Sequence, residues 1–250
     1  MRLGKGNLPY SAYRFLWNGL DWIFPPSCCS CGKMGERWCL DCQNQVLRMA
    51  DYATCPLCGN LSNKSKICHE CQSSPPKYDG LRSWGIYAGF LRLAIQQFKY
   101  ERNIGLSDTF APALIFLVHQ INRDFDMIVP VPLSKARLQE RGYNQSKLMS
   151  IPIHLALSIP ISTRALLRVQ HTPSQVGLRG GERRINVRNA FSANSCIVKA
   201  KNILVVDDVT TTGATMRACS ETLIQAGAKS VFGITLARAG LSSHPDSLSG

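Results

Sequence analysis

The sequence lacks any run of 18 or more apolar residues, so no segment is expected to span a membrane. The first residues also lack the continuous apolar stretch of a secretory signal, because Asn7, Arg14, Asn18 and Asp21 interrupt it. Acidic residues are scarce: 16 Asp and Glu stand against 29 Lys and Arg, which gives a formal net charge of +13. We therefore expect neither a membrane-spanning nor a secreted protein.

Basic charge is concentrated in residues 133–188, which hold ten Lys or Arg against two Asp or Glu, a net charge of +8. This excess of positive charge suits the binding of pyrophosphate, a phosphorylated substrate or nucleic acid. The alternative is a basic surface that keeps the protein soluble and binds polyanions without a specific function. With 250 residues, the chain can form one large domain or two modest ones.

Cysteine is abundant, with eleven residues, and eight of them form four Cys-x-x-Cys pairs. Two such pairs bring four thiolates to one ion, so the pattern predicts two structural zinc sites in a reducing, cytoplasmic compartment. A thioredoxin-like redox role is disfavoured, because no βαβ pattern surrounds the pairs. In the simplest, sequential assignment the ligands are Cys28, Cys31, Cys39 and Cys42 for one site, and Cys55, Cys58, Cys68 and Cys71 for the other.

The sequence leaves some of this assignment open. An interleaved pairing is also compatible with the spacing, and Cys29 could replace a neighbouring ligand. His69 lies between two ligands and is interpreted as a bystander, since the thiolate count is already complete.

The apolar pattern predicts four segments along the chain. They are an amphipathic helix within residues 1–24, the cysteine pairs in 25–75, an α/β domain in 76–239 and a flexible tail in 240–250. The helix could dock on the chain's own core or lie on a membrane surface, and docking is favoured because its polar face lacks a lysine cluster.

Within the α/β domain the pattern predicts alternating strands and helices. The expected strands are 81–91 (a strand or hairpin), 127–131, 163–169, 203–206 and 230–236, and the expected helices are 93–100, 106–121, 135–157 and the one after Gly213.

The most informative stretch is residues 203–228, a strand, loop and helix in one unit. Four apolar residues, 203–206, indicate a strand buried on both faces, ending at Asp207 and Asp208. A polar turn around Gly213 leads into a helix that Gly227 closes. In parallel sheets, ligands bind beyond the carboxyl ends of the strands, and the N-terminus of the following helix offers N–H groups to a phosphate.

No Gly-Lys-Ser/Thr follows the strand, which excludes a Walker loop. Two adjacent carboxylates would repel a phosphate, so Asp207 and Asp208 are expected to bind hydroxyl groups or a metal that bridges to them. A ribose 5-phosphate fits both requirements, because its hydroxyl groups suit the two carboxylates and its phosphate suits the helix N-terminus. The alternative is an ordinary strand with a capped helix and solvated aspartates.

Residues 203–215 resemble the phosphoribosyl-pyrophosphate (PRPP) motif of type I phosphoribosyltransferases. The resemblance implies that Asp207 and Asp208 hold the ribose 2- and 3-hydroxyls and are the catalytic pair. The residues that it assigns to the 5-phosphate are Thr211, Thr212, Gly213, Ala214 and Thr215.

Val-Pro-Leu-Ser-Lys, Arg-Gly-Tyr-Asn-Gln, Thr-Pro-Ser-Gln and Arg-Arg-Ile-Asn-Val precede this motif in order, after the cysteine pairs. Together they resemble the ComF family, which includes GntX-type proteins. The resemblance implies a parallel sheet flanked by helices, as in type I phosphoribosyltransferases, preceded by a small double zinc ribbon. It places Leu133, Ser134 and Lys135 in a pyrophosphate loop. The expected lid, a long basic segment, contains Thr172, Gln175, Arg179, Arg183, Arg184 and Arg188.

The ComF resemblance implies a protein that binds PRPP with magnesium and handles single-stranded DNA during natural transformation, with competence or recombination proteins as partners. The alternative is an active transferase with an unidentified acceptor. Many phosphoribosyltransferases carry a carboxylate where this chain has Thr211, which argues against purine salvage, and no residue is identified as the acceptor's base. A phosphatase is disfavoured because it needs Asp-x-Asp spacing.

Overall fold

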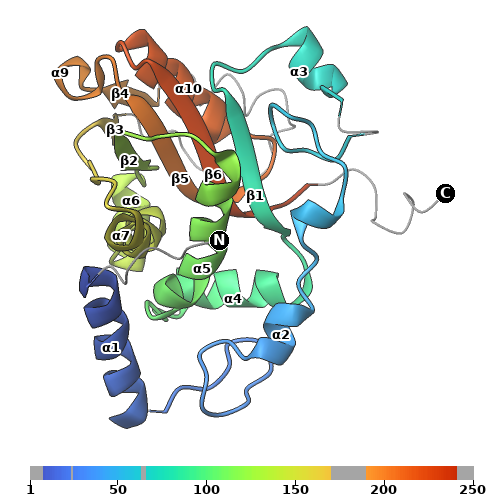
Figure 1. The fold of residues 1–250 in the computed structure, drawn as a ribbon, viewed down its shortest axis with the longest axis vertical. Helices are drawn as coiled ribbons and strands as arrows, with labels where there is room; N and C mark the ends of the chain where they lie inside the picture. Colours follow the sequence, from blue (N-terminus) through green and yellow to red (C-terminus); the bar gives the residue numbers. More distant parts are fainter. Residues whose placement is uncertain (1–7, 24, 63–65, 170–189, 241–250) are drawn as a thin grey trace.

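The computed structural model describes residues 8–23, 25–62, 66–169 and 190–240. Its centre is a parallel sheet of four strands in the order β1-β6-β5-β2 (Figure 1). These strands are β1 (Gly80–Ile86), β2 (Met127–Pro130), β5 (Asn202–Thr210) and β6 (Ser230–Arg238). The predicted α/β class with a parallel sheet is confirmed.

Strand β5 lies between two neighbours and is buried on both faces, as its apolar run predicts. Leu204 and Val206 belong to the core on one face, and Ile203 and Val205 to the core on the other. The predicted end at Asp207 and Asp208 was wrong, because β5 continues to Thr210. Its backbone keeps pairing with β6 beyond the apolar run, and this ladder does not depend on apolar side chains.

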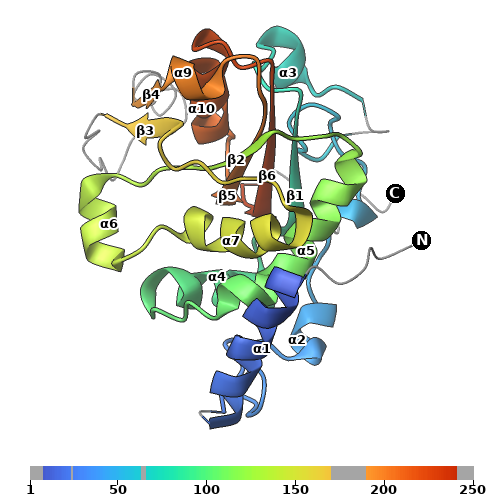
Figure 2. The same cartoon turned by 60° about the vertical axis from the view of Figure 1, so that its left-hand side comes forward.

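Helices cover both faces of the sheet (Figures 1 and 2). On one face, α5 (Leu106–Ile121) and α7 (Gln145–Leu157) pack together, and α4 (Gly89–Tyr100) lies beside α5. On the other, α10 (Ala214–Gln225) contacts β5 and β6 and a small antiparallel pair. That pair is β3 (Leu166–Arg168) with β4 (Phe191–Ala193), and the short α9 (Ser195–Val198) follows it.

Two element predictions need correction. For 81–91, the strand is confirmed and the hairpin is not: β1 is one strand parallel to β6. Its expected end was wrong, because β1 stops at Ile86 and α4 begins at Gly89. The helix expected over 135–157 is two helices, α6 (Lys135–Arg141) and α7. Gly142 breaks it with a left-handed φ of 80°, and the Asn144 side chain accepts a hydrogen bond from Lys147 N to start α7.

The N-terminal helix α1 (Leu8–Ile23) is present and lies against α7. Its Asp21 pairs with Arg37, whose guanidinium also stacks over Trp17 at 4.9 Å. Phe15 and Trp22 remain exposed. Among the described residues, no helix has the length and apolar character needed to cross a membrane.

The cysteine-bearing segment covers the free edge of β1. Leu47 O accepts a hydrogen bond from Ile86 N, and Leu57 O accepts one from Leu81 N, both at 2.8 Å. These bonds occupy backbone groups that an edge strand would otherwise leave open. The short helices of this segment are α2 (Leu40–Asn44), the 3₁₀ turn η1 (Met49–Asp51) and α3 (His69–Ser73).

Candidate functional site

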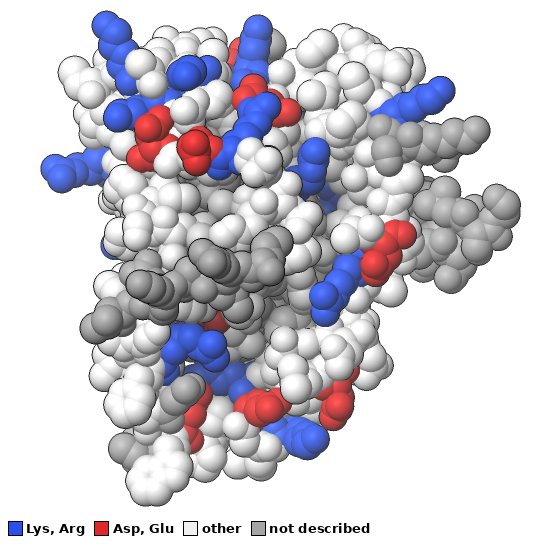
Figure 3. All heavy atoms as spheres, in the orientation of Figure 1, with Lys and Arg blue, Asp and Glu red and all other residues white. Residues whose placement is uncertain are grey.

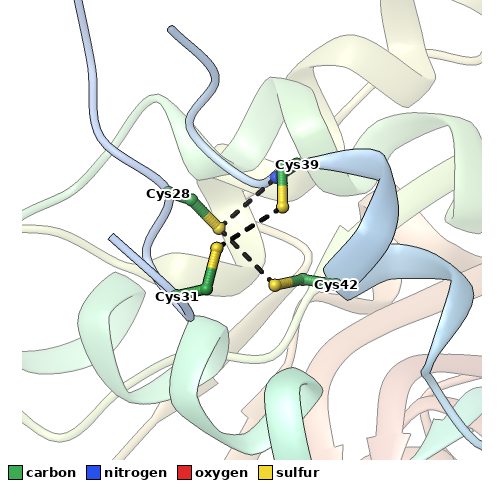
Figure 4. Close-up of side chains that lie close together, drawn as sticks. All are labelled: Cys28, Cys31, Cys39 and Cys42. Atoms are coloured by element: carbon green, nitrogen blue, oxygen red, sulfur yellow. Dashed lines mark hydrogen bonds between the residues drawn. The ribbon is translucent and has the colours of Figure 1, made fainter. Parts of the chain in front are cut away.

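The eight paired cysteines gather into two clusters of four, in the sequential rather than the interleaved arrangement. The first cluster is Cys28, Cys31, Cys39 and Cys42 (Figure 4), and the second is Cys55, Cys58, Cys68 and Cys71. Within each cluster all four sulfur atoms lie within 4.8 Å of one another.

The sulfur spacing fits a tetrahedral zinc site. Zn–S bonds of about 2.3 Å place the sulfurs roughly 3.8 Å apart. The Sγ atoms of Cys28 and Cys42 are 3.8 Å apart, and those of Cys58 and Cys68 are 3.6 Å apart. Cys29 and His69 lie outside both clusters. Each cluster can therefore hold one structural zinc ion without an open position.

One thiol in each cluster has a pKa below that of an ordinary cysteine. Burial acts to raise the pKa of Cys28, but the N–H groups of Cys39, Cys31 and Ser30 outweigh it and lower the pKa to about 6. The same balance lowers the pKa of Cys55 to about 7. Cys29 differs, since burial raises its pKa to about 12 and keeps it a thiol.

The carboxylate pair of β5 is held by groups from α4 and α7. Asp208 is buried, and its Oδ1 lies 3.0 Å from Lys99 Nζ of α4. Asp207 Oδ1 accepts hydrogen bonds from Ser146 Oγ of α7 at 3.0 Å and from Asp208 N at 2.9 Å. Asp207 keeps some exposed surface, yet burial of its carboxyl raises its pKa to about 7, and the adjacent charge of Asp208 acts in the same direction.

The loop after β5, residues 211–215, is named here the phosphate loop. Thr211 and Thr212 are exposed, and Gly213 adopts a left-handed φ of 76° at the start of α10. Thr212 Oγ1 accepts a hydrogen bond from Ala214 N at 3.4 Å. The first N–H groups of a helix have no partner within it, so the start of α10 can donate to an anion.

The expected pyrophosphate loop follows β2, the neighbour of β5. Val131 N donates to Val206 O at 3.0 Å, and Asn144 Nδ2 donates to Val131 O at 2.9 Å, which ties this loop to α7. Ser134 caps α6 by accepting from Arg137 N, and Lys135 is exposed. Leu133 and Ser134 are partly exposed. Residues 133–135 thus follow the strand beside β5, next to the strand that carries the carboxylates.

The lid residues of the sequence prediction lie outside the described residues. They are Thr172, Gln175, Arg179, Arg183, Arg184 and Arg188.

Sequence reasoning missed two side chains of the carboxylate site. Lys99 and Ser146 fall within the expected helices 93–100 and 135–157, and the sequence pattern gives them no further role. Ser146 follows the Arg-Gly-Tyr-Asn-Gln motif directly, which is the one local signal that could have singled it out. Lys99 carries no such signal, because its contact with Asp208 spans 109 positions (208 minus 99).

Residues 19–74 match the model of the double zinc ribbon domain. Competence protein F of Haemophilus influenzae is 33% identical over 213 residues, which cover 80% of this chain and 90% of that protein. The chain belongs to the ComF family. Other members include the DNA utilization protein YhgH of Escherichia coli K12, 32% identical over 72% of this chain and 82% of that protein. Competence protein ComFC of Bacillus subtilis is 28% identical over 82% and 86%.

Solved structures that overlap with this ComF protein include phosphoribosyltransferases. A purine phosphoribosyltransferase from Pyrococcus horikoshii covers 56% of this chain and 79% of its own, with 18% identity and a TM-score of 0.34. An adenine phosphoribosyltransferase from Leishmania tarentolae covers 57% and 74%, with 12% identity and a TM-score of 0.37.

Proposed function

We propose that this ComF protein binds PRPP together with magnesium. The observation that supports this most strongly is the carboxylate pair Asp207 and Asp208 near the end of β5, with the exposed Thr211 and Thr212 and the start of α10 a few residues further on. In this proposal the two carboxylates bind the ribose hydroxyls, and the backbone N–H groups of the phosphate loop bind the 5-phosphate. Magnesium would be held with PRPP beside Asp207 and Asp208, where it would neutralise negative charge on the pyrophosphate.

The remaining expected groups complete the proposed site. Residues 133–135 contact the pyrophosphate, and the basic lid segment neutralises it. Lys99 is a positioning residue: its ammonium group holds Asp208 in place and lowers the cost of keeping two carboxylates side by side. A cation that develops on the ribose as pyrophosphate leaves would be stabilised by the same carboxylates.

The pKa of Asp207 supports a charged or hydroxylic ligand at this position. A carboxyl with a pKa of about 7 is only half ionised at neutral pH. Magnesium or ribose hydroxyl groups favour its ionised form, so ligand binding should release protons near pH 7. Proton release gives a signal of binding that is independent of turnover.

Handling of single-stranded DNA in the cytoplasm, in concert with competence or recombination proteins, is the physiological role that we propose. The printed names of the relatives, competence protein and DNA utilization protein, support it. So do the exposed cations of α6 and α7, Lys135, Arg137 and Lys147. Among the described residues on the face drawn in Figure 3, by contrast, basic and acidic side chains are interspersed.

An aromatic side chain accompanies these cations. Tyr100 is 63% exposed, and Arg141 of α6 stacks over its ring at 5.1 Å. Tyr143 and Phe191 cannot serve as stacking platforms, because Tyr143 donates its hydroxyl to Phe98 O and Phe191 is buried. Tyr100 is therefore the aromatic residue best placed to stack on an unpaired base in this proposal.

The test of PRPP binding is titration calorimetry of the full chain with PRPP and magnesium. Wild-type protein should bind, and the Asp207→Asn, Asp208→Asn double variant should not, while Asp51→Asn, an exposed carboxylate in η1, should bind normally. Wild-type protein that ignores PRPP but binds other phosphates would refute the assignment of this pocket.

Transferase and binding protein are separated by measuring pyrophosphate release from PRPP across a panel of bases, amines and DNA ends. Release that depends on an acceptor would establish a transferase. Tight binding of PRPP and DNA without release would establish a binding protein on a transferase-like fold, which is the outcome that we favour.

A further inference from the structure

The second cysteine cluster is connected to the phosphate loop by two arginines. Arg217 lies in the first turn of α10, directly after the loop. Its Nη1 donates to Ser74 O at 2.8 Å, and its Nη2 donates to the thiol sulfur of Cys71 at 3.7 Å. The start of α10 is thus attached to a residue of the cluster itself.

Arg238, the last residue of β6, makes the second connection. It is only 3% exposed. Its Nη2 donates to Cys58 O, and its Nη1 donates to Thr211 O at 3.4 Å. One buried guanidinium therefore joins a backbone carbonyl of the cysteine cluster to a backbone carbonyl of the phosphate loop.

A negatively charged cluster favours this arrangement, since Cys58, Cys55 and Cys68 stabilise the charged form of Arg238 electrostatically. A zinc ion with four thiolates carries a net charge of about −2. In the part of the chain that the structure describes, neither Arg217 nor Arg238 forms an ion pair with a carboxylate. A buried guanidinium without a negative partner is costly, so the thiolate cluster is the group that compensates Arg238.

A third side chain adjoins the same loop. Tyr78 is 3% exposed, and its hydroxyl has no hydrogen-bond partner among the described residues. That hydroxyl lies 3.8 Å from the place where a Cβ on Gly213 would stand. A buried, unpartnered donor beside the start of α10 indicates that the loop receives another polar group.

The first cluster has none of these connections. It packs toward α4, where Ser30 Oγ donates to Phe90 O at 3.1 Å. Trp38, within this cluster's segment, stacks edge-on against Trp84 and Phe110 in the core beneath the helices. The two clusters therefore differ in what they support, and the first serves as a matched control for the second.

We propose that zinc in the second cysteine cluster fixes the conformation of the phosphate loop through Arg217 and Arg238. When zinc leaves, the cluster no longer fixes Cys71 and the Cys58 carbonyl, so Arg217 and Arg238 lose fixed partners, and the loop and the first turn of α10 become loose. Coupling of this kind is reciprocal, so a phosphate ligand on the loop slows zinc loss from the second cluster. Only the identity of that ligand rests on the proposed function.

The experiment compares full-length Cys68→Ser with Cys31→Ser, which each remove one ligand from one cluster. Amide hydrogen exchange is followed in peptides that cover residues 210–218, with peptides from α5 as the control for global folding. We expect exchange at residues 210–218 to rise at least tenfold in Cys68→Ser and to change less than twofold in Cys31→Ser. Equal exchange at the loop in both variants, with α5 protected, would overturn the proposal.

A second variant keeps all eight cysteines, in case Cys68→Ser does not fold. Arg217→Met removes the contacts to Cys71 and Ser74, and Arg92→Met, an exposed arginine in α4, is its control. Zinc transfer to a chromogenic chelator should be about fivefold faster for one of the two ions in Arg217→Met, and loop exchange should rise. Unchanged zinc release and unchanged loop exchange would overturn the proposal.

Addition of PRPP with magnesium separates this inference from the proposed function. If PRPP slows zinc release from the second cluster of wild-type protein, both are supported. If the variants show the coupling by hydrogen exchange but calorimetry shows no PRPP binding to wild-type protein, the inference stands and PRPP binding fails. PRPP that binds without slowing zinc release would overturn the inference.

Discussion

The ammonium group of Lys99 lies 3.0 Å from Oδ1 of Asp208, although the two residues come from α4 and from the end of β5. Both side chains are largely buried, with 15% and 12% of their surface exposed. Removal of the cation in Lys99→Met leaves Asp208 uncompensated. We expect a loss of about 2 kcal/mol in the free energy of unfolding, together with weaker PRPP binding.

A double-mutant cycle identifies the pair as the cause. Lys99→Met combined with Asp208→Asn should cost less than the sum of the single variants by about 1 kcal/mol or more, measured by denaturant unfolding at pH 7. Additive effects would show that the two groups act independently.

The raised pKa of Asp207 predicts that its contribution to the stability of the protein falls as the pH rises toward neutral. An unfolded Asp titrates near pH 4, whereas the pKa of Asp207 in the folded protein is raised to about 7. Because the folded state holds this proton more tightly, the contribution of Asp207 to stability is full below about pH 4 and is lost as the pH rises through about 7.

The Asp207→Asn variant removes this loss. It retains an oxygen that can accept from Ser146 and Asp208 N, but it does not ionise. Relative to wild type, it should gain about 1 kcal/mol or more between pH 4 and pH 8. Denaturant unfolding over this range measures the difference. A constant difference at all pH values would contradict the raised pKa.

The two cysteine clusters predict the zinc content. Purified protein should contain close to two zinc ions per chain. Metal removal should unfold the cysteine segment, because zinc binding supplies much of the free energy that keeps this segment folded. Cys29→Ser should retain both ions, because Cys29 lies outside the clusters and its pKa is raised to about 12. Elemental analysis checks both numbers. One ion in wild-type protein, or a segment that stays folded without metal, would contradict the assignment.

Single-stranded DNA should bind with strong salt dependence, because neutralised phosphates release counterions. Alanine at Arg179, Arg183, Arg184 and Arg188 should weaken binding and make the plot of log affinity against log salt less steep. Alanine at four exposed basic residues of the described chain, Arg92, Lys199, Lys201 and Lys229, provides the control. If PRPP competes with DNA, the lid serves both ligands, and if it does not, the DNA site lies elsewhere.

The strand, loop and helix of residues 203–225 could be predicted because their signals are local. Four consecutive apolar residues bury β5 on both faces, and Gly213 and Gly227 supply the left-handed positions at the two ends of α10. The spacing of the cysteines likewise predicts two four-thiolate sites, although only the fold selects the sequential arrangement.

Other features depend on partners that are distant in sequence. Nothing near Asp208 indicates that β5 continues to Thr210, because the extra residues are held by pairing with β6. Nothing in the cysteine segment indicates that Leu47 and Leu57 bind the edge of β1, or that Trp38 enters the core beside Phe110. The break at Gly142 was accessible locally, since glycine followed by an Asn cap ends one helix and starts another.

The strand order β1-β6-β5-β2 has a consequence for synthesis of the chain. The two strands made first occupy the outer positions of the four-stranded sheet, and within that sheet the neighbour of each comes from the last fifth of the sequence. During translation β1 and β2 therefore lack the two central strands until β5 and β6 leave the ribosome. The cysteine clusters, complete by Cys71, can close long before that. We expect the nascent chain to carry folded metal sites ahead of an unassembled sheet, and chains that stop before β5 to aggregate.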